Sequence, residues 1–137
     1  MNLTVNYVPH HLCAQTWPKV EGFIAEAMKH GFGDYTLEQA KLLVNMGSWL
    51  LLVAVDDQGV IHGAATVSFL NNPNHRSAFI TFIGGRLISN KETFKQMCDI
   101  LKANGATRVQ GMARPSIARL WKRYGFYERT TLVETML

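Results

Sequence analysis

Two adjacent glycines in the second half of the chain, with the polar residues that follow them, are suited to phosphate binding. Gly84 and Gly85 follow a mostly apolar run and precede a polar stretch typical of a helix start. Glycine lets a backbone approach a phosphate closely, and the amides at a helix N-terminus attract negative charge. These observations predict a cofactor-binding segment made of Ile83, Gly84, Gly85, Arg86, Ser89, Asn90 and Lys91. The other interpretation, a plain turn between a strand and a well-capped helix, is favoured, because the consensus of a phosphate-binding loop is absent.

One tyrosine is a candidate proton donor for a group-transfer reaction. Tyr124 lies near the end of a predicted helix, and a phenol can act as a general acid. It is also in helical phase with Ile117 and Leu120, which favours a position in the core. We therefore keep Tyr124 only as a fallback catalytic residue. The five histidines show no metal-ligand spacing, so no metal site is predicted.

The positive charge of the chain is concentrated in one segment. The formal net charge is +4 over 137 residues. Residues 1–85 hold four basic against six acidic residues, whereas residues 86–129 hold ten basic against three acidic residues. Such a field favours an acidic protein surface or nucleic acid as a partner. The alternative is a solvated basic face that keeps the protein soluble.

Length and composition predict one domain with a buried core. The 137 residues are 47% apolar and 18% charged, which excludes a disordered chain. The longest apolar run, at residues 49–55, is too short to span a bilayer, so no membrane partner is expected. No signal peptide is visible, and Cys13 and Cys98 form no C-x-x-C pair. We expect a reduced protein in the cytoplasm.

The first half of the chain predicts two helices among a group of strands. Residues 4–8 predict a short first strand. Thr16, followed by Pro18 in the first turn, predicts the start of a helix that ends at Gly31. A capping box at residues 36–39 predicts a second helix. The continuous apolar run at residues 49–55 predicts a strand buried on both faces, and its predicted partners are residues 60–70 and 77–83.

The second half of the chain alternates helices and strands. A capping box at residues 89–92, with Ser89 as the N-cap, predicts a third helix that ends near Gly105. A short strand at residues 108–113, a fourth helix at residues 117–124 and a last strand at residues 130–136 follow. Strands separated by a helix tend to lie parallel, so this order predicts a mixed sheet with helices on both faces. No linker or repeat divides residues 1–137, which predicts a single domain.

The order of these elements, together with short motifs, resembles the GNAT superfamily of acyl-CoA N-acyltransferases. Residues 114–126, R-P-S-I-A-R-L-W-K-R-Y-G-F, are similar to a helix of that family that ends in glycine-phenylalanine. Residues 61–64, I-H-G-A, are similar to its third strand, and residues 77–85 lie where the family binds the cofactor pyrophosphate. The resemblance implies an α/β (α+β) fold with a mixed, mostly antiparallel central sheet of about six to seven strands, flanked by four helices.

The resemblance also implies a cofactor and a reaction. In that family, amides between the fourth strand and the third helix hold the pyrophosphate of acetyl-CoA, which corresponds here to residues 83–91. The pantetheine arm lies between two splayed strands, here residues 77–84 and 108–113. An amine attacks the thioester, and a tyrosine on the fourth helix protonates the leaving thiolate.

Three departures from the family pattern bear on that chemistry. The family's phosphate loop normally reads arginine or glutamine, two residues, glycine, one residue, and glycine or alanine, and residues 84–90 lack that pattern. Leu87 and Ile88 are unexpected there, because glycine is what lets a backbone approach a phosphate closely. Trp121 replaces the acid tyrosine on an apolar helical stripe, and an indole is no useful proton donor to a thiolate. The family's asparagine falls on Arg114, and residues 77–83 contain no carboxylate to act as a base. The acyl-transfer machinery is therefore predicted to be incomplete.

The favoured hypothesis is a GNAT-fold protein with eroded acyltransferase motifs, similar to the divergent GNAT-like proteins of tailed bacteriophages. The narrower resemblance is carried by the glycine pair at residues 84–85, by residues 111–114 and by residues 125–126. It implies an assembly role in contact with other protein subunits, no cofactor, and a place in the host-cell cytoplasm or the virion. The alternative is an active acetyl-CoA-dependent N-acetyltransferase that acts on a small amine or a lysine. A third hypothesis is a non-catalytic module that binds CoA or a nucleotide.

Overall fold

The apolar runs of the sequence form one sheet in the computed structural model, which describes residues 1–137. Five strands make up the sheet: β1 (Thr4–Tyr7), β2 (Leu50–Val55), β3 (Ile61–Asn71), β4 (Arg76–Gly85) and β5 (Arg108–Gly111). They lie in chain order across it. The first four strands are antiparallel to their neighbours, and β5 is parallel to β4.

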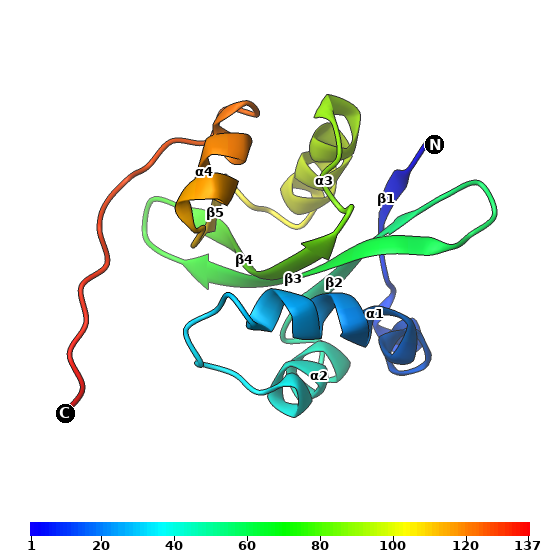
Figure 1. The fold of residues 1–137 in the computed structure, drawn as a ribbon, viewed down its shortest axis with the longest axis horizontal. Helices are drawn as coiled ribbons and strands as arrows, with labels where there is room; N and C mark the ends of the chain where they lie inside the picture. The colour runs from blue at the N-terminus through cyan, green and yellow to red at the C-terminus, as the bar shows by residue number, and fades with distance from the viewer.

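Four helices cover both faces of the sheet, as predicted (Figure 1). These are α1 (Cys13–Met28), α2 (Leu37–Asn45), α3 (Lys91–Ala103) and α4 (Pro115–Lys122). Successive side chains of a strand point to opposite faces. Leu51 accordingly lies in the core under α1 and α2, and Leu52 lies in the core under α3 and α4. The prediction that β2 is buried on both faces is confirmed. None of the helices has the length and apolar character that crossing a membrane requires.

Both predicted capping boxes are present, but the second begins one residue later than predicted. At α2, Thr36 and Gln39 each accept the backbone amide of the other. At α3 the N-cap is Asn90 rather than Ser89, and Asn90 Oδ1 accepts the Thr93 amide at 2.9 Å. The Thr93 hydroxyl in turn accepts the amides of Ser89 and Asn90, at 2.9 and 3.1 Å. Threonine at the third helical position therefore completes the box, which shifts the cap to Asn90.

The start of α1 also differs from the prediction. A 3₁₀ turn at His10–Leu12 leads directly into α1, so the helix begins at Cys13 and not after Thr16. The Thr16 hydroxyl donates to the Leu12 carbonyl at 2.8 Å inside the helix instead of capping it. Pro18 consequently lies one turn into the helix, where its missing amide leaves one carbonyl of the preceding turn without a helical partner.

A β-bulge divides β4 into a first part that pairs with β5 and a second part that does not. β4 pairs with β5 only as far as Ile80 and Gly111. The register between β3 and β4 shifts at the next residue, Thr81. Thr66 of β3 lies opposite Phe82, and the following residue, Val67, lies opposite Ile80. A bulge bends and twists the strand that carries it. The bulge thus coincides with the point where β4 continues to Gly85 without β5.

The last predicted strand, at residues 130–136, does not form, so the sheet has five strands rather than six to seven. Its threonines and its valine favour β-structure, but a strand also needs a neighbour for its backbone groups. The segment instead leaves the body of the protein after α4 and stays exposed (Figure 1). An ion pair of 3.2 Å between Lys122 and Glu128 lies near its start.

Candidate functional site

A cleft of about 310 Å³ lies where β4 and β5 separate. Its lining comes mainly from four parts of the chain: the middle of β4, the end of α1 with the connection to α2, the connection between β5 and α4, and α4 itself. The strand contributes Phe79, Ile80, Thr81, Phe82 and Ile83. Ligand sites of α/β proteins are typically mostly apolar clefts with a few polar groups, and this cleft has that character.

Trp121 of α4 lies in the wall of the cleft and belongs to the core. Its exposed fraction is 7%, which confirms the predicted packing role. A Cβ at Gly111 would come within 3.1 Å of the indole, so a side chain there would require the ring to shift by a few tenths of an ångström. The ring of Phe126 packs on Trp121 with 5.1 Å between centroids. A packed indole therefore forms part of the wall of the cleft where the two strands separate.

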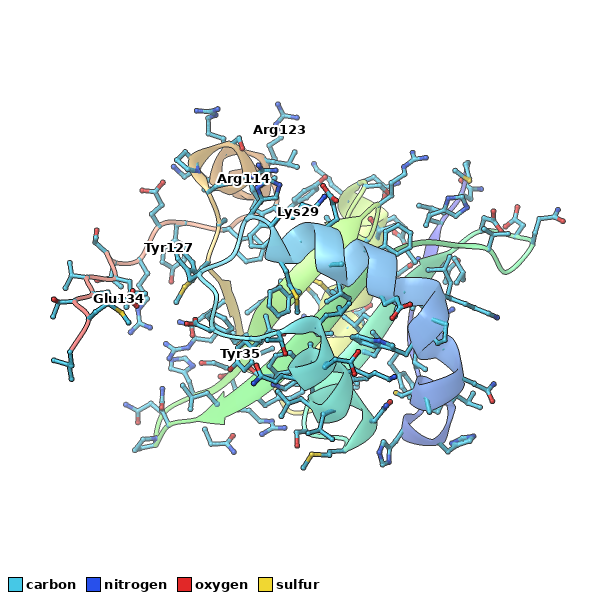
Figure 2. The ribbon with its side chains drawn as sticks, turned by 60° about the horizontal axis from the view of Figure 1, so that its bottom comes forward. Lys29, Tyr35, Arg114, Arg123, Tyr127 and Glu134 are labelled. Carbon is cyan, nitrogen blue, oxygen red and sulfur yellow. The ribbon has the colours of Figure 1, made fainter.

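Polar side chains reach the cleft from the connection between α1 and α2. They belong to His30, Asp34 and Tyr35. Arg114, the N-cap residue of α4, donates from Nη1 to His30 Nδ1 at 3.2 Å (Figure 2 shows Arg114 above the end of α1). A guanidinium is only a donor, so His30 Nδ1 is the acceptor and carries no proton. This hydrogen bond connects α4 with the loop after α1 across the cleft.

Three groups that line the cleft are able to take part in proton transfer. The Thr81 hydroxyl donates to the Thr66 carbonyl at 2.8 Å and is held inside the sheet. Tyr35 is the only tyrosine that lines the cleft, and its ring meets Trp49 edge-on with 4.8 Å between centroids. Asp34 is the only carboxylate there. The cleft therefore offers one phenol, one imidazole and one carboxylate, all from the same loop.

The predicted cofactor-binding residues follow each other at the end of β4 and the start of α3, but only Ile83 lines the cleft. Gly84 packs directly against the backbone carbonyl of Phe23 in α1, where a side chain would clash. Gly85 lies against the carbonyl of His62. The two glycines thus serve the contact between α1 and the sheet, in addition to any role in a ligand site.

Most amides of the turn between β4 and α3 are already used within the chain. The Arg86 amide donates to the His62 carbonyl at 2.8 Å. The amides of Ser89 and Asn90 donate to Thr93, as described above. Leu87 is fully buried, which leaves its amide out of reach of a ligand. Among residues 86–90, only Ile88 has an amide that is neither bonded within the chain nor fully buried.

These amides do not form a cradle for a pyrophosphate. A cradle needs several adjacent backbone N–H groups that point at the same anion. Lys91 and Glu92, the first two residues of α3, are exposed, and their amides have no acceptor within the chain. The amides on either side of them, at Asn90 and Thr93, are satisfied, so only this pair is able to meet an anion from outside. The side chain of Arg86 is exposed as well. The residues present therefore do not fit the pyrophosphate of acetyl-CoA.

Tyr124 lies outside the cleft. Its ring stacks on Phe94 of α3 with 5.2 Å between centroids and 21° between planes. It lines a separate hollow beside β5, together with Arg108 and Phe126. This position matches the packing alternative, and the role of Tyr124 as a proton donor stays a prediction.

The thiols offer no activated nucleophile. Burial raises the pKa of Cys13 and is also the main cause that raises the pKa of Cys98. Both thiols are therefore protonated at neutral pH, whereas a nucleophilic cysteine needs a lowered pKa. No group of histidine, cysteine or acidic residues gathers that could hold a metal ion.

The basic segment, residues 86–129, is mostly solvent-facing. Lys95 and Lys122 form ion pairs, with Asp99 at 2.8 Å and Glu128 at 3.2 Å. The Arg108 guanidinium donates to the Ser77 hydroxyl at 2.7 Å. Seven further basic residues are exposed and have no acidic partner: Arg86, Lys91, Lys102, Arg114, Arg119, Arg123 and Arg129. They lie on α3, α4 and the adjoining turns, so the charge asymmetry of the sequence becomes an exposed basic surface.

Sequence reasoning did not identify the loop that carries the polar groups of the cleft. His30, Asp34 and Tyr35 lie between α1 and α2, in a stretch with Gly31 and Gly33. A glycine-containing loop with aromatic residues between two helices is a place where binding residues often lie, and this was the available signal. Its approach to β4 depends on the tertiary fold and is not visible in the sequence.

No protein-family model matches this sequence, and no curated protein matches it. Solved structures, however, match over nearly the whole chain. An aminoglycoside acetyltransferase from an uncultured soil metagenomic sample has a TM-score of 0.70 at 15% identity, covering 100% of this chain and 99% of that chain. Glucosamine-6-phosphate N-acetyltransferase from Arabidopsis thaliana has a TM-score of 0.63 at 12% identity, covering 99% of both chains.

A third similar structure was solved with acetyl-CoA. It is a predicted acetyltransferase from Clostridium acetobutylicum, with a TM-score of 0.65 at 11% identity, covering 98% of this chain and 96% of that chain. The chain therefore has the fold of the GNAT acetyltransferases, which confirms the fold class that the resemblance implies. At these identities the likeness establishes the fold alone.

Proposed function

We propose that this GNAT-fold protein transfers no acyl group and acts through contact with other proteins, as an assembly or structural protein of a bacteriophage particle. The observation that carries the first part is the turn between β4 and α3. Its amides at Arg86, Ser89 and Asn90 donate to acceptors of the chain itself, and Leu87 is buried. An anion has to displace these bonds before it can bind there.

The side chains at the expected point of proton transfer support the same proposal. Trp121 occupies the position at which the resemblance implies a tyrosine, and its ring is packed against Gly111 and Phe126. An indole N–H is a hydrogen-bond donor but does not release its proton to a thiolate at neutral pH. We therefore expect no resident cofactor, and we assign no catalytic step to this chain.

The proposed partner is another protein subunit that meets the basic surface or the exposed C-terminal end. The exposed arginines and lysines of residues 86–129 suit an acidic protein surface, and packaged nucleic acid would suit the same charge. The particle itself is proposed from the bacteriophage-like motifs at residues 84–85, 111–114 and 125–126. The protein would then lie in the cytoplasm of the host cell and in the virion.

Calorimetric titration with acetyl-CoA and with CoA tests the first part. We expect no heat of binding at millimolar cofactor, because the phosphate contacts are missing. Micromolar binding of either compound, followed by thiol release with a panel of amines, would contradict the proposal. Mass spectrometry of purified particles from the source tests the second part, and absence of the protein from every particle would contradict it.

An active acetyl-CoA-dependent N-acetyltransferase for a small amine or a lysine is the second candidate, and one observation favours it. The cleft between β4 and β5 is open, and Tyr35, His30 and Asp34 supply it with groups that can move protons. If thiol release is found, Tyr35→Phe separates the two roles of this side chain. Loss of turnover with unchanged cofactor affinity would assign the hydroxyl to catalysis, whereas Tyr124→Phe should leave turnover unchanged if Tyr124 only packs on Phe94.

A further inference from the structure

A hollow of about 610 Å³ lies beside the first residues of β2 and shares no lining residue with the cleft. β2 begins at Leu50, opposite Val67, so residues 68–71 of β3 continue beyond it and pair with β4 alone. β1 does not reach this point either, since its last residue lies opposite Leu52. The turn between α2 and β2 and the end of α3 also line the hollow. The hollow therefore exists because two strands end before the hairpin of β3 and β4 does.

The lining of this hollow is mostly apolar and contains one arginine. Trp49, Leu50 and Phe69 are among its apolar residues. Arg76 is the only arginine or lysine that lines it, and no aspartate or glutamate does. The other polar side chains belong to Tyr7, His10, Ser48 and Asn104. Sites for small molecules typically measure about 300–1,000 Å³ and combine an apolar lining with a few placed polar groups, and this hollow, called here the Arg76 hollow, has that character.

The guanidinium of Arg76 is held in place without a counter-charge. Its Nε donates to the Asn104 carbonyl and its Nη1 donates to Asn71 Oδ1, both at 3.0 Å. Its central carbon lies 4.3 Å from the centroid of the Phe69 ring. No acidic side chain forms an ion pair with it. Arginine has five N–H donors, so these two hydrogen bonds leave three of them unused.

A carboxylate is the group that best completes this environment. Two parallel N–H groups of a guanidinium match the two oxygens of a carboxylate, and such charge-assisted bonds are stronger than neutral ones. The bonds to Asn71 and Asn104 already fix the side chain of Arg76, so little conformational freedom is lost when an anion binds. Arg76 is also only partly exposed, which strengthens its attraction for an anion relative to a charge in bulk water.

We propose that the Arg76 hollow binds a small monocarboxylate with an apolar body, such as an arylalkanoate. The carboxylate pairs with the guanidinium of Arg76, and the body packs on the apolar lining. A free amino acid is a poorer ligand, because no carboxylate in the lining can pair with its ammonium group. Inorganic phosphate is poorer as well, because it leaves the apolar lining without a partner.

This inference goes beyond the proposed function and does not depend on it. The Arg76 hollow contains neither the residues of the cleft nor those of the turn before α3. A chain that binds acetyl-CoA can still bind a monocarboxylate here, and a chain without this site can still lack acyl transfer. The two proposals are tested with different compounds, so the failure of one is distinct from the failure of the other.

A titration of the full chain with 3-phenylpropionate, followed by the NMR signals of the backbone amides at constant pH and ionic strength, tests the site. We expect saturable shifts at Gly47, Ser48 and Asn104, which line the hollow, and unchanged signals at Gly31 and Gly33 of the cleft. The matched compounds are 3-phenylpropionamide, which lacks the charge, phenylalanine, which adds the ammonium group, and inorganic phosphate, which lacks the apolar body. Each should bind at least about tenfold more weakly.

Two substitutions and one control locate the binding. Arg76→Gln removes the charge and should weaken the binding of 3-phenylpropionate at least about tenfold, whereas Arg119→Gln, the same change at an exposed arginine of α4, should leave it unchanged. Ala103→Leu enlarges a side chain that lines the hollow and leaves Arg76 in place, so it should also weaken binding. It carries the test if Arg76→Gln does not fold.

Three results would overturn the proposal. The first is the absence of shifts at Gly47, Ser48 and Asn104 at the highest concentration of 3-phenylpropionate. The second is equal binding of the amide, of phenylalanine or of phosphate, because the hollow would then not select an apolar monocarboxylate. The third is wild-type affinity in folded Arg76→Gln or in Ala103→Leu, or an equal loss of affinity in Arg119→Gln, because binding would then not depend on this hollow.

Discussion

Residues 1–85 and residues 86–137 differ in how they are held in the fold. In the first region the strands β1 to β4 are paired along their length and helices α1 and α2 bury one face of the sheet. In the second region Trp121 is the only buried residue after Leu101, β5 has one bare side, and the C-terminal segment is exposed. The exposed basic side chains also belong to the second region. The first region therefore holds most of the buried core, and most of the exposed basic surface lies in the second.

The largest effect that tests this contrast is expected from the tryptophan under α1 and α2. Trp17 is 1% exposed, and Trp17→Ala should lower the free energy of unfolding by about 3–5 kcal/mol, since it leaves a large cavity. Urea denaturation measures this change. Trp17→Phe is the control and should cost much less, because the indole N–H has no partner in the structure and little polar bonding is lost.

A somewhat smaller loss is expected from the tryptophan of the second region. Trp121→Ala should lower the free energy of unfolding by about 3 kcal/mol, since the ring is buried but borders two hollows into which neighbours can relax. The same urea titration applies. A loss below about 1 kcal/mol would show that α4 contributes little to the fold, and a loss above that of Trp17→Ala would reverse the contrast.

Two glycines, Gly22 in α1 and Gly84 in β4, test how tightly the first region is packed close to its boundary with the second. A side chain at Gly84 clashes with the Phe23 carbonyl, so Gly84→Ala should cost about 1–3 kcal/mol. Gly22, in the middle of α1, has nothing within 4 Å of a Cβ, so Gly22→Ala should raise stability by about 0.5–1 kcal/mol. Thermal denaturation of both variants compares them. Equal effects of the same sign would mean that α1 does not lie against the end of β4.

The smallest expected effect concerns the stability of the protein at low pH, through Asp56 in the turn between β2 and β3. The hydrogen bond from His62, followed by the amides of Val60 and Gln58, holds the pKa of Asp56 below its ordinary value of 3.8. A lowered folded pKa stabilises the protein above the pKa of the unfolded chain, and this contribution is lost as the pH falls through the folded value. The free energy of unfolding, measured against pH, should therefore fall less steeply below about pH 4 in Asp56→Asn than in the wild type.

The neighbouring aspartate provides the control for this measurement. Asp57 is exposed and has no hydrogen-bond partner, so Asp57→Asn should follow the wild-type curve. Asp56→Asn should still lose some stability in acid, because two other carboxyl groups also have a lowered pKa. Lys29 lowers the pKa of Glu26, and Lys95 lowers the pKa of Asp99. Identical curves for Asp56→Asn and the wild type would mean that the His62 contact is absent in solution.

Local sequence signals predicted the elements whose cause is local. The box at Thr36 and Gln39 and the doubly buried run of β2 are confirmed, because capping and apolar periodicity act within a few residues. The cap at Ser89 was wrong by one residue, since Asn90 and Thr93 satisfy each other better. The predicted start of α1 was wrong because a 3₁₀ turn at His10–Leu12 leads into the helix. His10 of this turn hydrogen-bonds to the Asn45 carbonyl of α2 at 2.6 Å, a contact that no local pattern shows.

The candidate site was less predictable, because its parts come from separate segments. The cleft depends on the bulge at Thr81 and on the loop around Tyr35, and neither has a sequence pattern that places it beside β4. The residues predicted to bind the cofactor do lie at one turn, but hydrogen bonds to Thr93 and to His62 use their amides. Which amides remain free is decided by packing and not by residue type.

The sequence by itself determined the order of the elements, the two-sided burial of β2, the concentration of positive charge after residue 85 and the replacement of the expected acid by Trp121. These features follow from residue types and short spacings. Only the tertiary structure decided that β4 and β5 splay, that the turn before α3 is self-satisfied, and that residues 130–136 stay unpaired beside a bare edge. A strand or an anion site exists only when distant segments supply the partners for its backbone groups, and those partners are set by the fold.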